Sequence, residues 1–325
     1  MITSICYDHY TKNQDSLTIC HMSISRKGDV IMHKLKYACL IIVTTFLMGI
    51  AFPVGKIGLS YAPPFLLMGM RFVLAGGLLA LFCYKRKQPL GKMQWLQAAI
   101  IGLFQSAGVM GCAFFSMRWI SASESAILTT SSPLFVIIMG TLIAGAVYRV
   151  RQWFGVAIGF VGVAIALGFH LGMQPGTFIS LAGAVSFASA TLFIKRWSPN
   201  FDLNVLAAYQ MLTGGIALLL MSFVTEHPFF TVTVKSVAVV LWLAVMCSIV
   251  QFTLWFYLLH RGDPGKTSSF LFLVPLFGVF TSWLLLGERV EWYVGAGGLL
   301  IGIGIFLVNW EGNRLVVAST KKIAS

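Results

Sequence analysis

The two halves of this chain carry the same sequence landmarks in the same order. Ser132–Phe135, which reads Ser-Pro-Leu-Phe, recurs as Val274–Phe277, and Trp153–Gly155 further along recurs as Tyr293–Gly295. An internal repeat constrains the architecture before any residue is given a role. Two earlier pairs of segments match in the same way: Gly49–Lys56 with Ala188–Lys195, and Ala75–Gly77 with Thr213–Gly215.

Composition places both halves in a membrane. The chain is 58% hydrophobic and only 10% charged, whereas a soluble domain has about 25% charged residues. Its apolar stretches are about 20 residues long, enough to cross a hydrocarbon core of about 30 Å, and they lack the alternation of barrel strands. We therefore predict an all-α polytopic membrane protein with ten transmembrane helices. The predicted spans are Tyr37–Leu59, Pro64–Tyr84, Gln94–Ser116, Ser121–Ala146, Trp153–Leu171, Gly176–Lys195, Val205–Val224, Ser236–His260, Lys266–Leu286 and Glu291–Trp310.

Each copy of the repeat holds five predicted spans, an odd number, so the second copy enters the membrane in the opposite direction. Two inverted five-helix repeats are a recurrent plan of secondary transporters. We assign residues 32–171 to the first repeat, 172–311 to the second and 312–325 to a cytoplasmic tail. Residues 1–31 are polar and lack a signal-peptide apolar region. They are predicted to be a disordered leader, or an extension upstream of a natural start near Met32.

The basic residues set the predicted orientation. With the N-terminus inside, 18 of the 23 lysines and arginines fall on the inner side, and the positive-inside rule then places both termini in the cytoplasm of a cell (inner) membrane protein. This bias accounts for the net charge of +13, so no nucleic-acid partner is predicted.

Motifs for enzymes and cofactors are missing from the sequence. The six cysteines form no Cys-x-x-Cys pair and no metal-ligand spacing, so neither a disulfide framework nor a metal site is predicted. We find no His-Glu-x-x-His helix, no Gly-x-Ser-x-Gly elbow and no phosphate loop. No cofactor is expected, and an intramembrane enzyme remains only as an alternative.

Three prolines fall inside predicted spans: Pro53, Pro133 and Pro275. Proline removes an intrahelical hydrogen bond and kinks a helix, and membrane helices tolerate this when neighbouring groups satisfy the freed carbonyls. These residues are the hinge candidates, with a static kink as the alternative.

Ionisable residues inside spans are functional candidates because burying a charge in lipid costs at least about 2.5–3.5 kcal/mol. Lys56 and Arg71 fall in the outer half of the predicted membrane, where Glu124 is the nearest carboxylate in depth. We hypothesise that one of the two cations pairs with Glu124 as an outer gate or as an anchor for a substrate carboxylate. The alternatives are that Lys56 reaches the interface and that Arg71 forms a structural pair. Glu288 is the remaining charged candidate, and no acidic residue falls at mid-membrane, which leaves proton coupling unsupported.

Neutral polar side chains supply the predicted substrate cavity. They occur at matching places in the third and eighth spans and on the turn before Pro133, where they would hydrogen-bond a substrate; the alternative is helix packing. Gln210, near the repeat position of Arg71, is assigned the same role in the other half. The cavity candidates are Gln105, Ser106, Thr130, Ser248, Gln251, Trp255 and Tyr257.

Glycines concentrate in the fifth and tenth predicted spans, for example Gly155, Gly159, Gly295 and Gly302. Small residues let helix backbones approach closely in a membrane. These spans are predicted to pack closely, either within the chain or at a homodimer face.

Together these features resemble the EamA-type transporters of the drug/metabolite transporter superfamily. The resemblance extends over residues 37–310 and rests on Gly49–Lys56, Pro64–Phe72, Ser132–Phe135, Val274–Phe277, Leu286–Arg289, Gly295 and Gly302. It implies export or exchange of small metabolites, often amino acids, through a cavity lined by helices 1, 3, 4, 6, 8 and 9. Two positions depart from the family pattern: Ala146 stands opposite Glu288 without a carboxylate, and Met48 replaces an aromatic residue.

We therefore predict a secondary transporter of small organic metabolites that works by alternating access, with export of amino acids or their relatives as the leading function. Drug or quaternary-ammonium efflux is the alternative within transport, and a channel fits the repeated kinks less well. The predicted partners are a small-molecule substrate and the lipid bilayer.

Overall fold

The computed structural model describes residues 37–129, 131–142, 145, 148–166, 174–288 and 292–309. The chain divides into two units, Met1–Val43 and Thr44–Ser325. In the first unit the described residues are 37–43, which are helical and begin the helix Tyr37–Gly58. All contacts described below lie within the second unit.

Every regular element in the described part of the chain is helical, and seven helices are long and apolar enough to cross a membrane. Their bounds are Tyr37–Gly58, Pro64–Phe82 (α2), Lys92–Ser116, Pro175–Asn200, Leu203–Thr225 (α9), Val234–Arg261 and Pro264–Leu286. Two shorter helices, α7 (Val150–Ala166) and α14 (Trp292–Asn309), occupy the fifth and tenth predicted spans. The fourth is divided into α5 (Ala122–Thr129) and α6 (Ser132–Leu142). The predicted all-α polytopic membrane fold is confirmed.

Several long helices change character along their length. The helix from Lys92 comprises α3 (Lys92–Gly102), η1 (Leu103–Gly111) and α4 (Cys112–Ser116). The helix from Pro175 comprises α8 (Pro175–Trp197) and η2 (Ser198–Asn200). The helix from Val234 comprises α10 (Val234–Ala244), η3 (Val245–Val250) and α11 (Gln251–Arg261). The last of the seven comprises α12 (Pro264–Ser269), η4 (Phe270–Phe272) and α13 (Leu273–Leu286).

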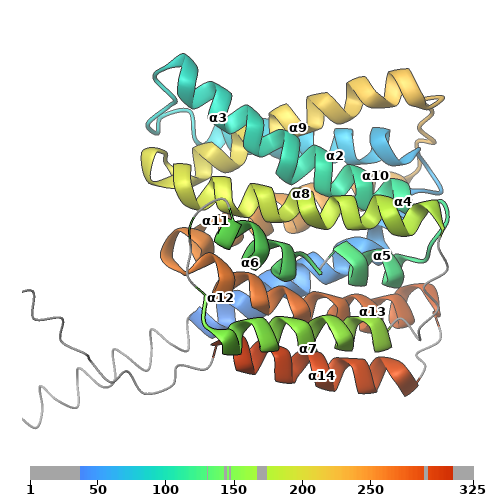
Figure 1. Ribbon diagram of the computed structural model, residues 1–325. Coiled ribbons are helices and arrows are strands. Elements are labelled where there is room, and N and C mark those ends of the chain that lie inside the picture. Colours follow the sequence, from blue (N-terminus) through green and yellow to red (C-terminus); the bar gives the residue numbers. More distant parts are fainter. Residues whose placement is uncertain are drawn as a thin grey trace, which may run out of the picture. The chain divides into compact units, whose positions relative to one another are not determined.

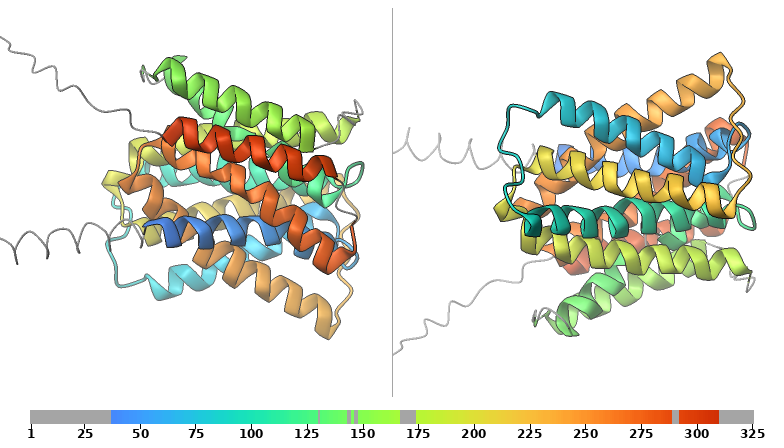
Figure 2. Two further views of the ribbon diagram at one scale, coloured as in Figure 1. Left: turned by 90° about the horizontal axis from the view of Figure 1, so that it is seen from below. Right: turned by 90° about the horizontal axis from the view of Figure 1, so that it is seen from above.

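Helices that match in the repeat pack against each other in antiparallel fashion. In α2 and α9, a Cβ added at Gly69 would lie 3.0 Å from the amide nitrogen of Leu219, and one added at Gly76 would lie 2.7 Å from that of Leu212. As residue numbers increase along α2, the residues that they contact in α9 have decreasing numbers, so the two helices are antiparallel. The views in Figure 1 and Figure 2 show the other matching pair, α7 and α14, side by side. No bilayer is present, so the inverted orientation across a membrane stays a prediction.

Two of the three prolines stand where a predicted span breaks. α5 ends at Thr129 and α6 begins one residue before Pro133, while Pro275 follows the 3₁₀ turn η4 and is the third residue of α13. Both breaks precede the proline, because its ring displaces the backbone of the preceding turn. The helix Tyr37–Gly58 continues through Pro53 without a break. Hinge motion at these residues remains a prediction.

A glycine with positive φ follows the helix after each of these breaks. Gly145, which follows α6, has φ 62°, and Gly287, which follows α13, has φ 68°. Left-handed backbone favours glycine because any Cβ raises its energy, and Gly287 uses it as the C-cap of α13. The two glycines occupy the positions that the sequence repeat pairs.

The third and eighth spans contain matching π-helical segments, η1 and η3. The predicted spans cover both segments, and the sequence analysis did not distinguish π-helix from α-helix within them. Hydropathy has the same pattern in both helix types, whereas a π-turn holds an extra residue and requires tertiary support. π-turns often occur at functional sites, and these two flank the cavity described next.

Candidate functional site

A small cavity lies between six helical spans, and all of its lining residues belong to the second unit. Its volume is about 20 Å³, which is room for about one water molecule. The spans that line it are the first, third, fourth, sixth, eighth and ninth, the set that the family resemblance implies. The lining residues are Met48, Phe52, Gln105, Val109, Met110, Thr129, Ser132, Phe187, Gln251, Phe252, Leu271 and Val274.

Gln105 is the most unusual group in this lining. Its side chain is 1% exposed, and neither its amide nitrogen nor its amide oxygen has a hydrogen-bond partner in the described structure. The hydroxyl of Ser132 is likewise buried without a partner. Leaving one such group unsatisfied costs about 1–3 kcal/mol. The cavity therefore offers donors and acceptors that a bound molecule can satisfy.

The rest of the lining is neutral. Thr129 Oγ1 lies 3.1 Å from Ser180 Oγ of α8, so that hydroxyl is already partnered. Gln251 contributes a second amide, from the first residue after η3, and is also buried. Methionine, valine, leucine and phenylalanine form the remainder, with no charged side chain among the lining residues. Such a lining offers hydrogen-bonding amides and hydroxyls beside apolar surface, without a charge.

The predicted cavity residues divide into two groups. Gln105 and Gln251 line the cavity, whereas Ser106 and Ser248 are buried outside its lining and bond to other helices. Thr130 lies outside the described residues, while its neighbour Thr129 is in the lining.

The two aromatic candidates lie outside the lining. Trp255 packs behind Phe187, with ring centroids 5.6 Å apart, and its indole nitrogen has no partner in the described structure. Tyr257 is 37% exposed, with the Arg261 guanidinium 5.7 Å from its ring centroid, and the lining of the cavity does not include it. Two residues along a helix turn a side chain by about 200°, which separates these neighbours.

The hypothesised pairing of Lys56 or Arg71 with Glu124 does not occur in this structure. Lys56 Nζ donates to the carbonyl oxygen of Met117 at 2.7 Å, and Arg71 donates to Ser248. Lys195 donates to the carbonyl of Leu259, at the place that matches Met117 in the repeat. A lysine on the last carbonyls of a helix offsets the negative end of its dipole, which explains both lysines without a carboxylate.

Glu124 instead caps α5. The amide of Ser121 donates to Glu124 Oε2 at 2.7 Å, and the amide of Glu124 donates to Ser121 Oγ at 3.1 Å. This reciprocal capping box has the sequence signature Ser-x-x-Glu, which was the signal available for predicting the role. Glu288 accepts a hydrogen bond from Ser123 and lies close enough to interact electrostatically with Lys56.

A buried carboxylate that sequence analysis did not single out is Glu226, after the C-terminus of α9. It accepts hydrogen bonds from the amides of Phe65 and Leu66 at the start of α2 and from Arg118 at 3.0 Å. Its side chain is 1% exposed, against 40% for Arg118. Because α2 begins with two prolines and no side-chain cap of its own, the other repeat supplies the cap.

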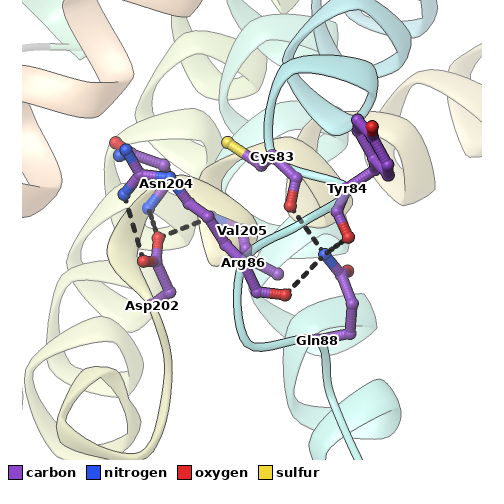
Figure 3. Close-up of polar contacts among 7 residues, drawn as sticks. All are labelled: Cys83, Tyr84, Arg86, Gln88, Asp202, Asn204 and Val205. Carbon is purple, nitrogen blue, oxygen red and sulfur yellow. Dashed lines mark hydrogen bonds and ion pairs between the residues drawn. The ribbon is translucent and has the colours of Figure 1, made fainter.

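Polar contacts also join the other end of the α2 and α9 pair, which Figure 3 shows. Arg86 donates to Asp202 at 3.1 Å, and Asp202 caps α9 by accepting from the amides of Asn204 and Val205. Gln88 donates to the carbonyl of Cys83 at 2.7 Å and so caps α2. Burial raises the pKa of the Cys83 thiol, so the thiol stays protonated at neutral pH. At this end an arginine after α2 contacts the cap of α9, and at the other end Glu226, after α9, caps α2 and contacts Arg118, which follows α4.

Comparison with known proteins gives the family. A model of the EamA-like transporter family matches residues 35–168 and again residues 174–310. An uncharacterized transporter of Bacillus subtilis is 26% identical over 282 residues, 84% of this chain and 97% of the relative. A probable amino-acid metabolite efflux pump of Escherichia coli is 25% identical over 293 residues, 84% of this chain and 94% of the relative.

A solved structure, described only as the crystal structure of a protein, shares the fold. Its TM-score is 0.67 at 19% identity, and the match covers 84% of this chain and 97% of that one. With both halves matched by the family model, this chain belongs to the EamA-like transporter family and is a transporter rather than an enzyme.

Proposed function

We propose that this protein exports small neutral metabolites, above all amino acids with apolar side chains, across the cell (inner) membrane by alternating access. The observation that carries the proposal is the cavity that six helical spans line, with the unsatisfied amide of Gln105 inside it. Both repeats contribute to this lining, so a movement of one repeat against the other opens it to one side at a time.

The chemistry of the lining favours amino acids without a side-chain charge. The amides of Gln105 and Gln251 can donate to a carboxylate and accept from an ammonium group, while Met48, Val109 and Phe187 shelter an apolar side chain. A charged side chain on the substrate would find no opposite charge in the lining. The free energy of hydration that this charge loses on entering the cavity would not be offset. The efflux pump of E. coli, whose name assigns it amino-acid metabolites, supports this substrate class.

The cavity must widen to hold such a molecule, because ligand sites typically have about 300–1,000 Å³ against about 20 Å³ here. The helix breaks before Pro133 and Pro275 lie next to the lining residues Ser132 and Val274, which supports the proposal that these breaks allow the widening. We assign the structure to a closed stage of the transport cycle, with both termini in the cytoplasm.

Coupling to protons is not part of the proposal. The described carboxylates, those of Glu124, Asp202, Glu226, Asp263 and Glu288, all lie at helix ends or in connecting segments. Exchange or facilitated movement down the substrate gradient needs no titrating group inside the membrane.

Efflux of quaternary ammonium compounds is the second candidate, because Phe52, Phe187 and Phe252 line the cavity. Aromatic rings bind quaternary ammonium groups through cation–π attraction. The described lining contains no carboxylate, so no negative charge offsets the free energy of hydration that the cation would lose. This candidate is therefore the less favoured one.

Purified protein in proteoliposomes tests the proposal. Liposomes are preloaded with one unlabelled compound at a time and given the labelled form outside, without a pH gradient. We expect saturable counterflow of L-leucine, L-methionine and L-threonine, with much slower movement of L-lysine and L-glutamate. Ethidium movement without amino-acid movement favours the second candidate, and no counterflow of any of these compounds contradicts the proposed function.

A further inference from the structure

Arg71 is fully buried, yet no carboxylate in the described structure pairs with it. Its Nε donates to Ser248 Oγ at 2.7 Å, and one terminal nitrogen donates to the carbonyl oxygen of Cys247. Both acceptors belong to the π-helical segment η3 of the other repeat. A buried guanidinium that donates hydrogen bonds to a π-helical segment stabilises that segment.

A second contact of this kind joins the opposite pair of elements. Gln210 of α9 is fully buried and accepts a hydrogen bond from Ser106 of η1 at 2.8 Å. Arg71 lies seven residues after Pro64, the start of α2, and Gln210 lies seven residues after Leu203, the start of α9. The two gripping side chains therefore occupy the same position in their repeats.

The two gripped serines are equivalent as well. Ser106 lies fourteen residues after Lys92, where its long helix begins, and Ser248 lies fourteen residues after Val234. Two cross-repeat hydrogen bonds thus join equivalent places, one with a cation and one with a neutral amide. In both hydrogen bonds, each partner occupies the repeat position of its counterpart in the other bond. Chance packing does not explain this equivalence.

A π-turn contains one residue more than an α-turn and so shifts the register of the helix that follows. Ser248 Oγ donates to the carbonyl oxygen of Leu243, five residues earlier, which is the spacing of a π-turn. If η3 reverted to α-helix, the residues after it would rotate by about 100° relative to those before it. Gln251 follows η3 directly, so this rotation would turn its amide away from the cavity.

We propose that Arg71–Ser248 and Gln210–Ser106 form a matched pair of latches between the repeats, which hold η3 and η1 in π-helical form. By holding η3, Arg71 aims Gln251 into the cavity and acts as a positioning residue rather than as a substrate-binding one. The neutral latch on η1 holds Ser106, the residue next to Gln105 inside that segment, and so fixes the backbone that carries Gln105. The inference deepens the proposed function, since the residues being aimed are those of the proposed substrate site.

A double-mutant cycle on Arg71→Met and Ser248→Ala tests the charged latch. Both variants remove the hydrogen bond between Arg71 and Ser248, Arg71→Met also removes the one to the Cys247 carbonyl, and methionine keeps much of the length of arginine. For L-leucine counterflow we expect each single variant and the double variant to raise KM by about tenfold with little change in kcat. The effects of Arg71→Met and Ser106→Ala, which break different latches, are expected to add.

Arg71→Gln is the conservative rescue, because it recreates the glutamine–serine bond that the other repeat uses. It should restore most of the KM that Arg71→Met loses. Additive effects of Arg71→Met and Ser248→Ala, an unchanged KM in Ser248→Ala, or no rescue by Arg71→Gln would overturn the latch. If Arg71→Met does not fold, Ser248→Ala and Arg71→Gln still decide.

A failure of the proposed substrate class is distinguishable from a failure of the latch. The same cycle is measured as the thermal unfolding temperature of the purified variants in detergent, which needs no substrate. Non-additive shifts support the latch even if the wild type does not move L-leucine, and additive shifts contradict it.

Discussion

Replacing Gln105 by leucine is expected to remove most transport while leaving the protein as stable as the wild type or more stable. The amide has no hydrogen-bond partner in the described structure, so leucine removes buried polar atoms whose lost hydration costs about 1–3 kcal/mol. The same change deprives the substrate of a donor and an acceptor, which lowers kcat/KM about 10- to 100-fold. Counterflow of L-leucine and the thermal unfolding temperature measure the two effects.

The matched control is Gln174→Leu, at an exposed glutamine that precedes α8 and makes no side-chain cap. It should change neither transport nor stability. Stability and activity moving in opposite directions is typical of a binding site that carries unsatisfied groups. A Gln105→Leu protein that transports like the wild type would remove Gln105 from the site.

A leucine at Gly304 is expected to cause the largest loss of folded protein. A Cβ at this position would lie 2.6 Å from the carbonyl oxygen of Gly155 and 2.8 Å from the Cα of Gly159, both in the backbone of α7. Backbone cannot yield as a side chain can, so even Gly304→Ala should cost about 1–3 kcal/mol. Gly304→Leu should separate α7 from α14 and reduce the monodisperse yield on size-exclusion chromatography.

Gly302 on the same helix provides the control. A Cβ there meets nothing within 4 Å, so Gly302→Ala and Gly302→Leu should leave the yield and unfolding temperature unchanged. Equal losses at both positions would contradict the packing described here. A loss at Gly302 together with a smaller elution volume for the wild type would instead place a second copy of the chain on that face.

Sequence analysis reached the fold because its signals were strong and repeated. Ten apolar stretches and matched landmarks such as Pro133 and Pro275 depend on hydropathy and backbone chemistry, which act locally. The close packing of the fifth and tenth spans followed from Gly155 in the same way. The π-helical segments were not predictable, since the side chains that contact them, Arg71 and Gln210, come from distant helices.

The candidate site was predicted less completely. Gln105 and Gln251 stood out because a buried amide is rare in a span, but apolar lining residues such as Met48 and Val274 do not differ in sequence from lipid-facing ones. The pairing of Arg71 with an acid rested on depth in the membrane alone. The depth of a residue in the membrane does not reveal that a backbone carbonyl and a serine hydroxyl can accept the hydrogen bonds of the guanidinium.

The most direct measurement is the accessibility of a single cysteine at Ser132, a nearly isosteric change in the cavity lining, in a protein without its native cysteines. Ser282→Cys is the control, because Ser282 is as deeply buried but is not a lining residue. Alternating access predicts that a membrane-impermeant methanethiosulfonate reagent modifies Ser132→Cys from either side of oriented vesicles, that L-leucine slows the reaction, and that Ser282→Cys stays unmodified. Modification of Ser132→Cys from one side only, or none in vesicles that transport L-leucine, would contradict the account.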